Sequence, residues 1–149
     1  MKQQFHLLVK AFLLLFVFIF GQSFFHKGGD YFKVLLNGKM VAEQYLTHPA
    51  AIKSLSLNNA NQNDRLAFYY SHCGKLGTNR AIALKNDHGN VLKEWKFSDA
   101  RLPEMQISVK EVLKASSNLN STSVYYISNE IPNGKLLINL HVPAAVAKN

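Results

Sequence analysis

Apolar and polar residues alternate with a period of two along most of the chain beyond residue 29, and clusters of turn-forming residues separate the alternating stretches. Such alternation is typical of β-strands that bury one face. Because no regular succession of strands and helices appears, we expect an all-β fold, an antiparallel β-sandwich of about seven to eight strands. The expected strands are residues 30–36, 39–46, 52–57, 65–70, 78–85, 91–97, 122–128 and 136–142.

The first two of these strands flank Asn37-Gly38, the residue pair that best fits a two-residue hairpin turn of type I′. With that turn, Val34 faces Val41 across the hairpin. The side of the hairpin that points to the core is then expected to consist of Phe32, Val34, Leu36, Val41 and Tyr45.

Later strands have equally regular apolar rows, and the last strand is expected to follow a turn at residues 131–134. An inward row is a set of alternate residues that share the buried face of a strand. The expected inward rows are Leu66, Phe68 and Tyr70 in one strand and Leu136, Ile138, Leu140 and Val142 in the last.

The helical signal of the sequence is confined to one short segment. Ser108 and Glu111 have the spacing of a capping box, in which each side chain satisfies a free backbone N–H at the start of a helix. We therefore expect one short helix that ends by Ala115. Trp95 and Phe97, which share one side of their strand, are expected to pack in the core.

The N-terminal segment has the order of a secretory signal. Lys2 and Lys10 are followed by ten uninterrupted apolar residues at 11–20 and then by Gly21-Gln22-Ser23, with small residues at two of the three positions. A helix of ten residues spans only about 15 Å, half of the hydrocarbon layer of a bilayer. We expect residues 1–23 to be a signal peptide, or an uncleaved anchor that is the only contact with a membrane. Residues 24–149 are then a single β-sandwich domain in the periplasm or outside the cell.

Composition narrows the possible partners. Hydrophobic residues make up 48% of the chain, too many for a disordered basic tail, although the net charge is +8. The lysines are spaced singly, and Arg65, Arg80 and Arg101 are far apart in the sequence. Nucleic-acid binders usually concentrate such residues on one face, so no nucleic-acid partner is expected.

One segment between two expected strands combines several chemically active residue types, and we take it as the candidate binding loop. Loops on a rigid scaffold are where binding residues collect, and glycines permit unusual backbone conformations there. The residues of the candidate binding loop are Ser71, His72, Cys73, Gly74, Lys75 and Gly77.

Two chemistries remain open for this loop. Copper or zinc would suit His72, Cys73, His88 and His141, although their spacing does not impose coordination. Alternatively, Cys73 is a nucleophile with His72 as its base, but neighbours on a strand point to opposite faces. A single cysteine at a strand end is more often a small buried apolar residue, so we expect no catalytic residue and no cofactor.

Aromatic side chains offer a second kind of binding surface. Tyr69 and Tyr125 have the opposite parity to the inward rows, so both are expected to be exposed. Together with Trp95, they would suit the stacking of carbohydrate rings.

The run of residues 69–75, with Gly77, Arg80 and residues 92–97 after it, resembles a group of small, uncharacterised, β-rich exported proteins of Bacteroidota. That resemblance implies an exported compartment and a β fold, and it implies no activity. We therefore expect an exported, non-enzymatic β-sandwich that binds a protein or glycan of the cell envelope. The alternative is a periplasmic metal-binding or thiol-active protein that uses His72 and Cys73.

Overall fold

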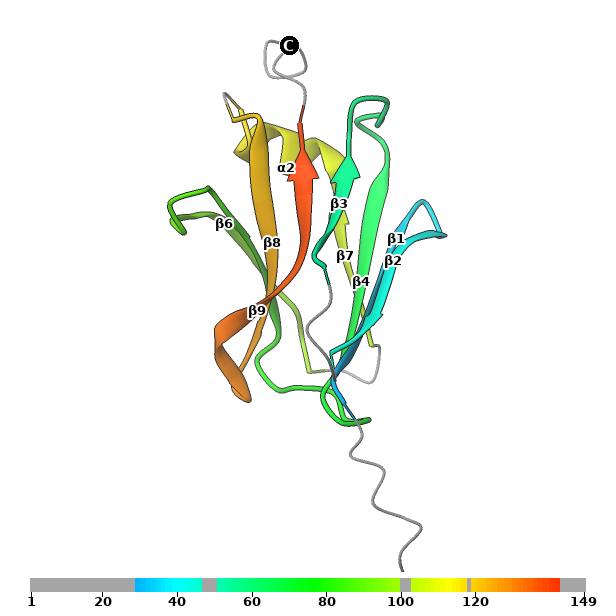
Figure 1. Cartoon of the computed structure of the whole chain (residues 1–149), viewed down its shortest axis with the longest axis vertical. Coiled ribbons are helices and arrows are strands. Elements are labelled where there is room, and N and C mark those ends of the chain that lie inside the picture. The colour runs from blue at the N-terminus through cyan, green and yellow to red at the C-terminus, as the bar shows by residue number, and fades with distance from the viewer. Residues whose placement is uncertain (1–28, 47–50, 100–102, 118, 143–149) are drawn as a thin grey trace, which may run out of the picture.

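The computed structural model of the protein describes residues 29–46, 51–99, 103–117 and 119–142, and their strands form two facing sheets (Figure 1). The first sheet has the order β2-β1-β4-β7 and the second has the order β3-β9-β8-β5-β6. The bounds are β1 Tyr31–Leu36, β2 Lys39–Tyr45, β3 Lys53–Ser56, β4 Arg65–Ser71, β5 Ala81–Lys85, β6 Val91–Lys96, β7 Glu104–Ser108, α2 Val109–Ala115, β8 Ser121–Ser128 and β9 Ile131–His141.

The predicted β-sandwich is confirmed, with one strand more than the sequence pattern indicated. The additional strand, β7, pairs with β4 and buries Met105 and Ile107. Most neighbours pair antiparallel, as expected, while β3 runs parallel to β9 at the edge of the second sheet. β3 thus lies in the second sheet, although β2 before it and β4 after it both belong to the first.

The core lies between the sheets and is filled by the inward rows of both. Leu66, Phe68 and Tyr70 are buried as predicted. In β9, Ile138 and Leu140 are buried as well, and so is Val142, which directly follows the strand. The helix α2 covers one end of this core (Figure 1), with its buried residues Val109, Val112 and Leu113.

The Asn37-Gly38 turn forms as predicted, with φ angles of 52° and 79° that suit a type I′ turn. The register of the hairpin beyond this turn differs from the prediction. A bulge next to Val34 places Ala42, instead of Val41, opposite Val34. An extra residue on one strand shifts the parity of everything that follows. Ala42 is therefore the buried residue.

Two side chains that were assigned to inward rows lie elsewhere for the same reason. Tyr45 is 66% exposed, since the bulge in the first hairpin turns it to solvent. Leu136 is only half-buried, because a second bulge pairs it with Tyr125 while Ile138 pairs with Val124. The intervening Leu137 is buried instead.

The predicted turn at residues 131–134 is wrong. The chain turns at Asn129 and Glu130, and β9 already begins at Ile131. Gly134 lies within β9 at a φ angle of 77°, which is a conformation that glycine adopts without strain.

The helix forms where the sequence predicted it, but without a capping box. Ser108 makes no side-chain capping hydrogen bond. Glu111 instead accepts hydrogen bonds from Lys93 Nζ at 2.8 Å and from Trp95 Nε1 at 2.9 Å, both on β6. These bonds fasten the helix to the edge of the second sheet, and Trp95 packs partly buried against the core, as does Phe97.

The predicted signal segment, residues 1–23, lies outside the described residues. Within the part of the chain that the structure describes, no helix is both long enough and apolar enough to span a bilayer.

Candidate metal centre

The candidate binding loop follows β4 at the lower end of the sandwich in Figure 1. His72 and Lys75 pair across a two-residue turn, with His72 N donating to Lys75 O at 2.8 Å and Lys75 N to His72 O at 2.9 Å. The turn residues are Cys73 and Gly74. The loop therefore begins as a tight hairpin that continues the strand.

Cys73 has a backbone conformation that is unusual for its residue type. Its φ angle is 50°, and that of Gly74 is 83°, the left-handed pair that a type I′ turn requires. Asparagine and glycine tolerate such positions well, whereas most other residues there lower the stability of the folded protein. The turn also removes the objection that neighbours on a strand point apart, because Cys73 is not in extended conformation.

Asp30 completes a group of three potential ligands. It immediately precedes β1, whose first residue, Tyr31, pairs with Ser71 at the end of β4. His72 Nδ1 lies 2.8 Å from Asp30 Oδ1, and Cys73 Sγ lies 3.9 Å from the same oxygen. One ligand atom from each of the three residues lies within 4.8 Å of the others. Among the described residues, no other group of three such side chains is this close.

The spacing of these atoms suits a small metal ion. Zinc-to-ligand distances of about 2.0–2.3 Å place the ligand atoms of a tetrahedral site about 3.3–3.8 Å apart. The separation of 3.9 Å between Cys73 Sγ and Asp30 Oδ1 lies just above that interval, whereas the 2.8 Å between His72 Nδ1 and Asp30 Oδ1 is an ion-pair distance about half an ångström below it. His72 Nδ1 has no aligned hydrogen bond with any described group, although it is close to Asp30 Oδ1.

Tyr70 holds the other oxygen of Asp30. Its hydroxyl donates to Asp30 Oδ2 at 2.6 Å. Burial, followed by the hydrogen bond to Asp30, raises the pKa of Tyr70 above its usual value, so the hydroxyl stays protonated and keeps donating. Asp30 Oδ1 is thereby left to face His72 and Cys73.

The same contacts weigh against a nucleophilic cysteine. A thiol that reacts at neutral pH needs a base that takes its proton. The hydrogen bond of the Cys73 thiol goes to Asp30 Oδ1, and His72 Nδ1 faces this carboxylate as well. Cys73 is exposed, so it is not the small buried apolar residue that the sequence favoured, and the expectation that it is not a catalytic nucleophile stays a prediction.

The far end of the candidate binding loop is packed against the turn between β8 and β9. Gly77 is buried, and a Cβ atom there would overlap the Tyr126 hydroxyl and lie 2.8 Å from Glu130 Oε2 and 2.9 Å from Ser128 Cβ. Only a residue without a side chain fits. Gly77 thus has a packing role, and the exposed Lys75 contributes no ligand to the group.

Gly77→Ala is expected to lower the free energy of unfolding by about 1–3 kcal/mol, the usual range for an overpacked site. Chemical denaturation monitored by circular dichroism measures this change. Leu76→Ala, at the 41% exposed neighbouring position, is the control and should change little. Equal stability of both variants would contradict the close packing around Gly77.

Glu130 forms hydrogen bonds with Thr78, directly after the candidate binding loop. Its carboxylate accepts from Thr78 N and Thr78 Oγ1, both at 3.0 Å. The Ser128 hydroxyl, followed by the backbone N–H groups of Glu130 and Thr78, lowers the pKa of Glu130 to about 2. The carboxylate therefore stays charged until strongly acidic pH.

Glu130→Gln is expected to reduce the pH dependence of stability in acid. A pKa lowered in the folded state stabilises the protein above the ordinary value near 4.5, and that contribution disappears as the pH falls towards 2. Thermal unfolding at a series of pH values should show the parent losing more stability than the variant over this interval. Parallel curves would show that Glu130 makes no such contribution.

The other histidines proposed as ligands lie away from this group. His88 is in the turn between β5 and β6, and His141 ends β9 at the opposite end of the sandwich (Figure 1). Neither is in the group formed by Asp30, His72 and Cys73.

The two tyrosines expected on the surface are partly exposed but do not share a surface. Tyr69 is on β4 with Lys33 Nζ 4.3 Å from the centre of its ring, and Tyr125 is on β8 with Lys85 Nζ at the same distance. Because β4 and β8 belong to different sheets, the outward sides of the two strands face in opposite directions.

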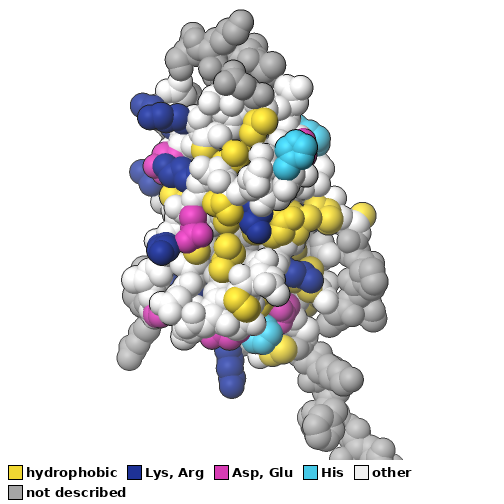
Figure 2. Space-filling view, turned by 90° about the vertical axis from the view of Figure 1, so that its left-hand side faces the viewer, with side chains coloured by type: hydrophobic (Ala, Val, Ile, Leu, Met, Phe, Trp, Pro, Cys, Tyr) yellow, Lys and Arg dark blue, Asp and Glu magenta, His cyan; other side chains and the backbone are white. Residues whose placement is uncertain are grey.

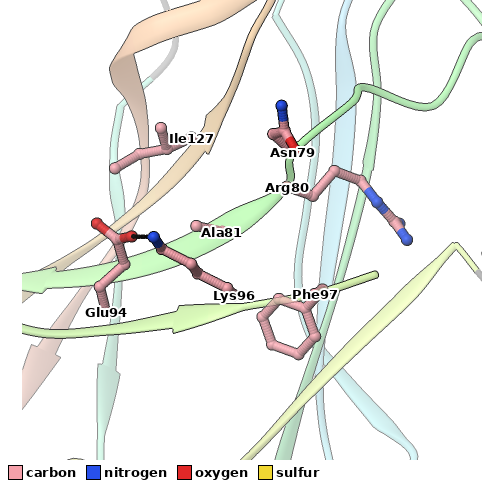
Figure 3. Close-up of a pocket in the computed structure, with 7 residues that line it drawn as sticks. All are labelled: Asn79, Arg80, Ala81, Glu94, Lys96, Phe97 and Ile127. Atoms are coloured by element: carbon pink, nitrogen blue, oxygen red, sulfur yellow. Dashed lines mark ion pairs between the residues drawn. The ribbon is translucent and has the colours of Figure 1, made fainter. Parts of the chain in front are cut away.

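A cleft lies where the segment before β5, the end of β6 and the end of β8 meet. Figure 2 shows one side of the molecule, on which hydrophobic side chains gather beside basic and acidic ones. The volume of the cleft is about 270 Å³. Glu94 and Lys96 at its rim form an ion pair at 4.0 Å, while the guanidinium of Arg80 points away and donates to Ser98 O and Pro103 O (Figure 3). The lining residues are Asn79, Arg80, Ala81, Glu94, Lys96, Phe97 and Ile127.

No protein-family model matches the chain. A search of curated proteins finds no significant match either. The resemblance to exported proteins of Bacteroidota therefore stays a prediction, and the chemistry of the group formed by Asp30, His72 and Cys73 has to be judged from its own geometry.

Proposed function

We propose that the protein is an exported β-sandwich that binds one metal ion through Asp30, His72 and Cys73. The observation that carries this proposal is the convergence of a carboxylate oxygen, an imidazole nitrogen and a thiol sulfur within 4.8 Å. These three donor types are the ones that proteins use for zinc and related ions. The three side chains come from two segments that are 42 residues apart and meet only in the fold (Asp30 to His72).

The backbone at Cys73 supports a functional reason for the cysteine. A left-handed conformation at a residue other than glycine, asparagine or aspartate costs stability, and such residues gather at functional sites. Asparagine would satisfy the turn better, as it does at Asn37 in the first hairpin. A metal ligand at this position would account for the cysteine.

Metal binding thus replaces the envelope-binding hypothesis as the favoured function. Tyr69 and Tyr125 are only partly exposed and lie on different sheets, so they offer no joint platform for a glycan. Export itself rests on residues 1–23, and it stays a prediction.

Isothermal titration with Zn²⁺ tests the proposal. The parent is expected to bind one ion per chain, and His72→Ala should weaken binding at least about 100-fold because a direct ligand is removed. His88→Ala is the matched control, since it removes an exposed histidine outside the group. If the parent binds no ion, or if both variants bind as the parent does, the proposal is wrong.

A further inference from the structure

We infer that Tyr70 selects the class of ion at this centre by restricting Asp30 to one ligating oxygen. This inference rests on the proposed metal binding by Asp30, His72 and Cys73. The selected ions are divalent ions of intermediate hardness, such as Zn²⁺ and Co²⁺, which the centre would bind with four ligands. Tyr70 acts here as a positioning residue, because it touches Asp30 and does not touch the ion.

The hydrogen-bond pattern of Asp30 carries the first step. Tyr70 donates to Oδ2 at 2.6 Å, whereas His72 and Cys73 both approach Oδ1. The Tyr70 hydrogen bond occupies a lone pair of Oδ2 and fixes the orientation of the carboxylate, so an ion bound by His72 and Cys73 meets Asp30 through Oδ1. Asp30, His72 and Cys73 then supply one donor atom each, and a fourth position stays open to water or to an added ligand, as in zinc sites with three protein ligands.

This donor set disfavours the hard cations calcium and magnesium. Calcium takes six to eight oxygen ligands and often uses both oxygens of a carboxylate, and magnesium requires a nearly ideal octahedron of oxygens. The centre provides a single carboxylate oxygen, one nitrogen and one sulfur. Thiolate and imidazole favour softer ions.

A stacking contact with a second tyrosine holds the Tyr70 ring in place. Its ring stacks on that of Tyr126 from the other sheet, with centroids 4.1 Å apart and planes inclined by 8°. Both rings are buried, with at most 2% of either residue exposed. The stacked pair bridges the two sheets, so the Tyr70 hydroxyl meets Asp30 from a rigid support, and outer partners of this kind typically change metal affinity by about 10- to 100-fold.

Titration with Co²⁺ tests the inference, because the visible absorption of this ion reports its coordination. The parent should show the strong absorption of four-coordinate Co²⁺ together with a sulfur-to-metal charge-transfer band. Tyr70→Phe keeps the stacked ring but removes the hydrogen bond to Oδ2. Because Asp30 is then no longer held in place, Co²⁺ binding is expected to weaken about 10- to 100-fold. The visible absorption is expected to fall, because the free Oδ2 can also ligate the ion and raise its coordination number. Circular dichroism verifies that the variant is folded.

Tyr31→Phe is the matched control. It also removes a tyrosine hydroxyl that is bonded to a carboxylate, that of Glu43 on β2, in the same sheet. This variant is expected to bind Co²⁺ within about twofold of the parent and with the same spectrum, because neither Tyr31 nor Glu43 belongs to the ligand group.

The outcomes separate this inference from the proposed function. A parent that binds neither Zn²⁺ nor Co²⁺ overturns both. A parent that binds, combined with a Tyr70→Phe variant of identical affinity and spectrum, overturns the role of Tyr70 alone. X-ray absorption of the Zn²⁺-loaded parent gives a measurement that needs no variant: four donors including one sulfur are expected, and six donors would overturn the inference.

Discussion

Cys73→Asn is expected to abolish metal binding while the protein stays as stable as the parent or becomes slightly more stable. The thiolate is the strongest donor of the proposed centre, and an amide oxygen does not replace it. In the left-handed turn, however, asparagine is favoured over cysteine, and such positions cost most residues about 1–2 kcal/mol. Zinc titration and denaturation without metal measure the two effects on the same variant.

A loss of zinc binding without a loss of stability would distinguish a ligand role of Cys73 from a structural one. Leu76→Asn, three residues further along the same loop, is the control and should change neither zinc affinity nor stability appreciably, because the Leu76 side chain is 41% exposed. A Cys73→Asn variant that binds zinc like the parent would remove the cysteine from the ligand set. A marked loss of stability in the absence of metal would instead give Cys73 a structural role.

Ile138→Asp is expected to unfold the protein at neutral pH. Ile138 is 1% exposed and belongs to the core between the sheets. The substitution loses the packing of a large apolar side chain, about 2–5 kcal/mol, and buries a charge without a partner in addition. That sum approaches the whole stability of a small domain, about 5–15 kcal/mol. Circular dichroism and thermal unfolding report the outcome.

His141→Asp provides the matched control on the same strand. His141 is exposed at the end of β9, so its replacement by the same residue is expected to be mild. If Ile138→Asp were as stable as the parent, the inward row of β9 would be assigned to the wrong face.

The sequence predicts the strands well, because each strand has its own alternation and most turns have their own residues, although the turn expected at 131–134 lies within β9. Eight of the nine described strands follow from these local signals. The ninth, β7, alternates correctly through Met105 and Ile107, but its last residue, Ser108, also precedes the helix, and the helical signal concealed the strand. The register errors at Val34 and Leu136 come from bulges, which depend on the fit between strands and leave little trace in one sequence.

The proposed metal ligands were only partly predictable for a related reason. His72 and Cys73 stand out as soft ligands in a loop, and the Gly that follows them indicates a turn. Asp30 carries no such signal. It reaches His72 only because β1 pairs with β4, and that pairing joins strands separated in the sequence by β2 and β3. Tyr70 was correctly placed in the core, but its bond to Asp30 depends on the same pairing.

Metal analysis of the protein, purified without chelators from the cells that produce it, tests the central claim most directly. Mass spectrometry under native conditions gives the ion and its stoichiometry for each chain. We expect one zinc-like ion per chain in the parent and none in His72→Ala or Cys73→Asn. A parent that holds no metal and does not take up Zn²⁺ when it is supplied would contradict it.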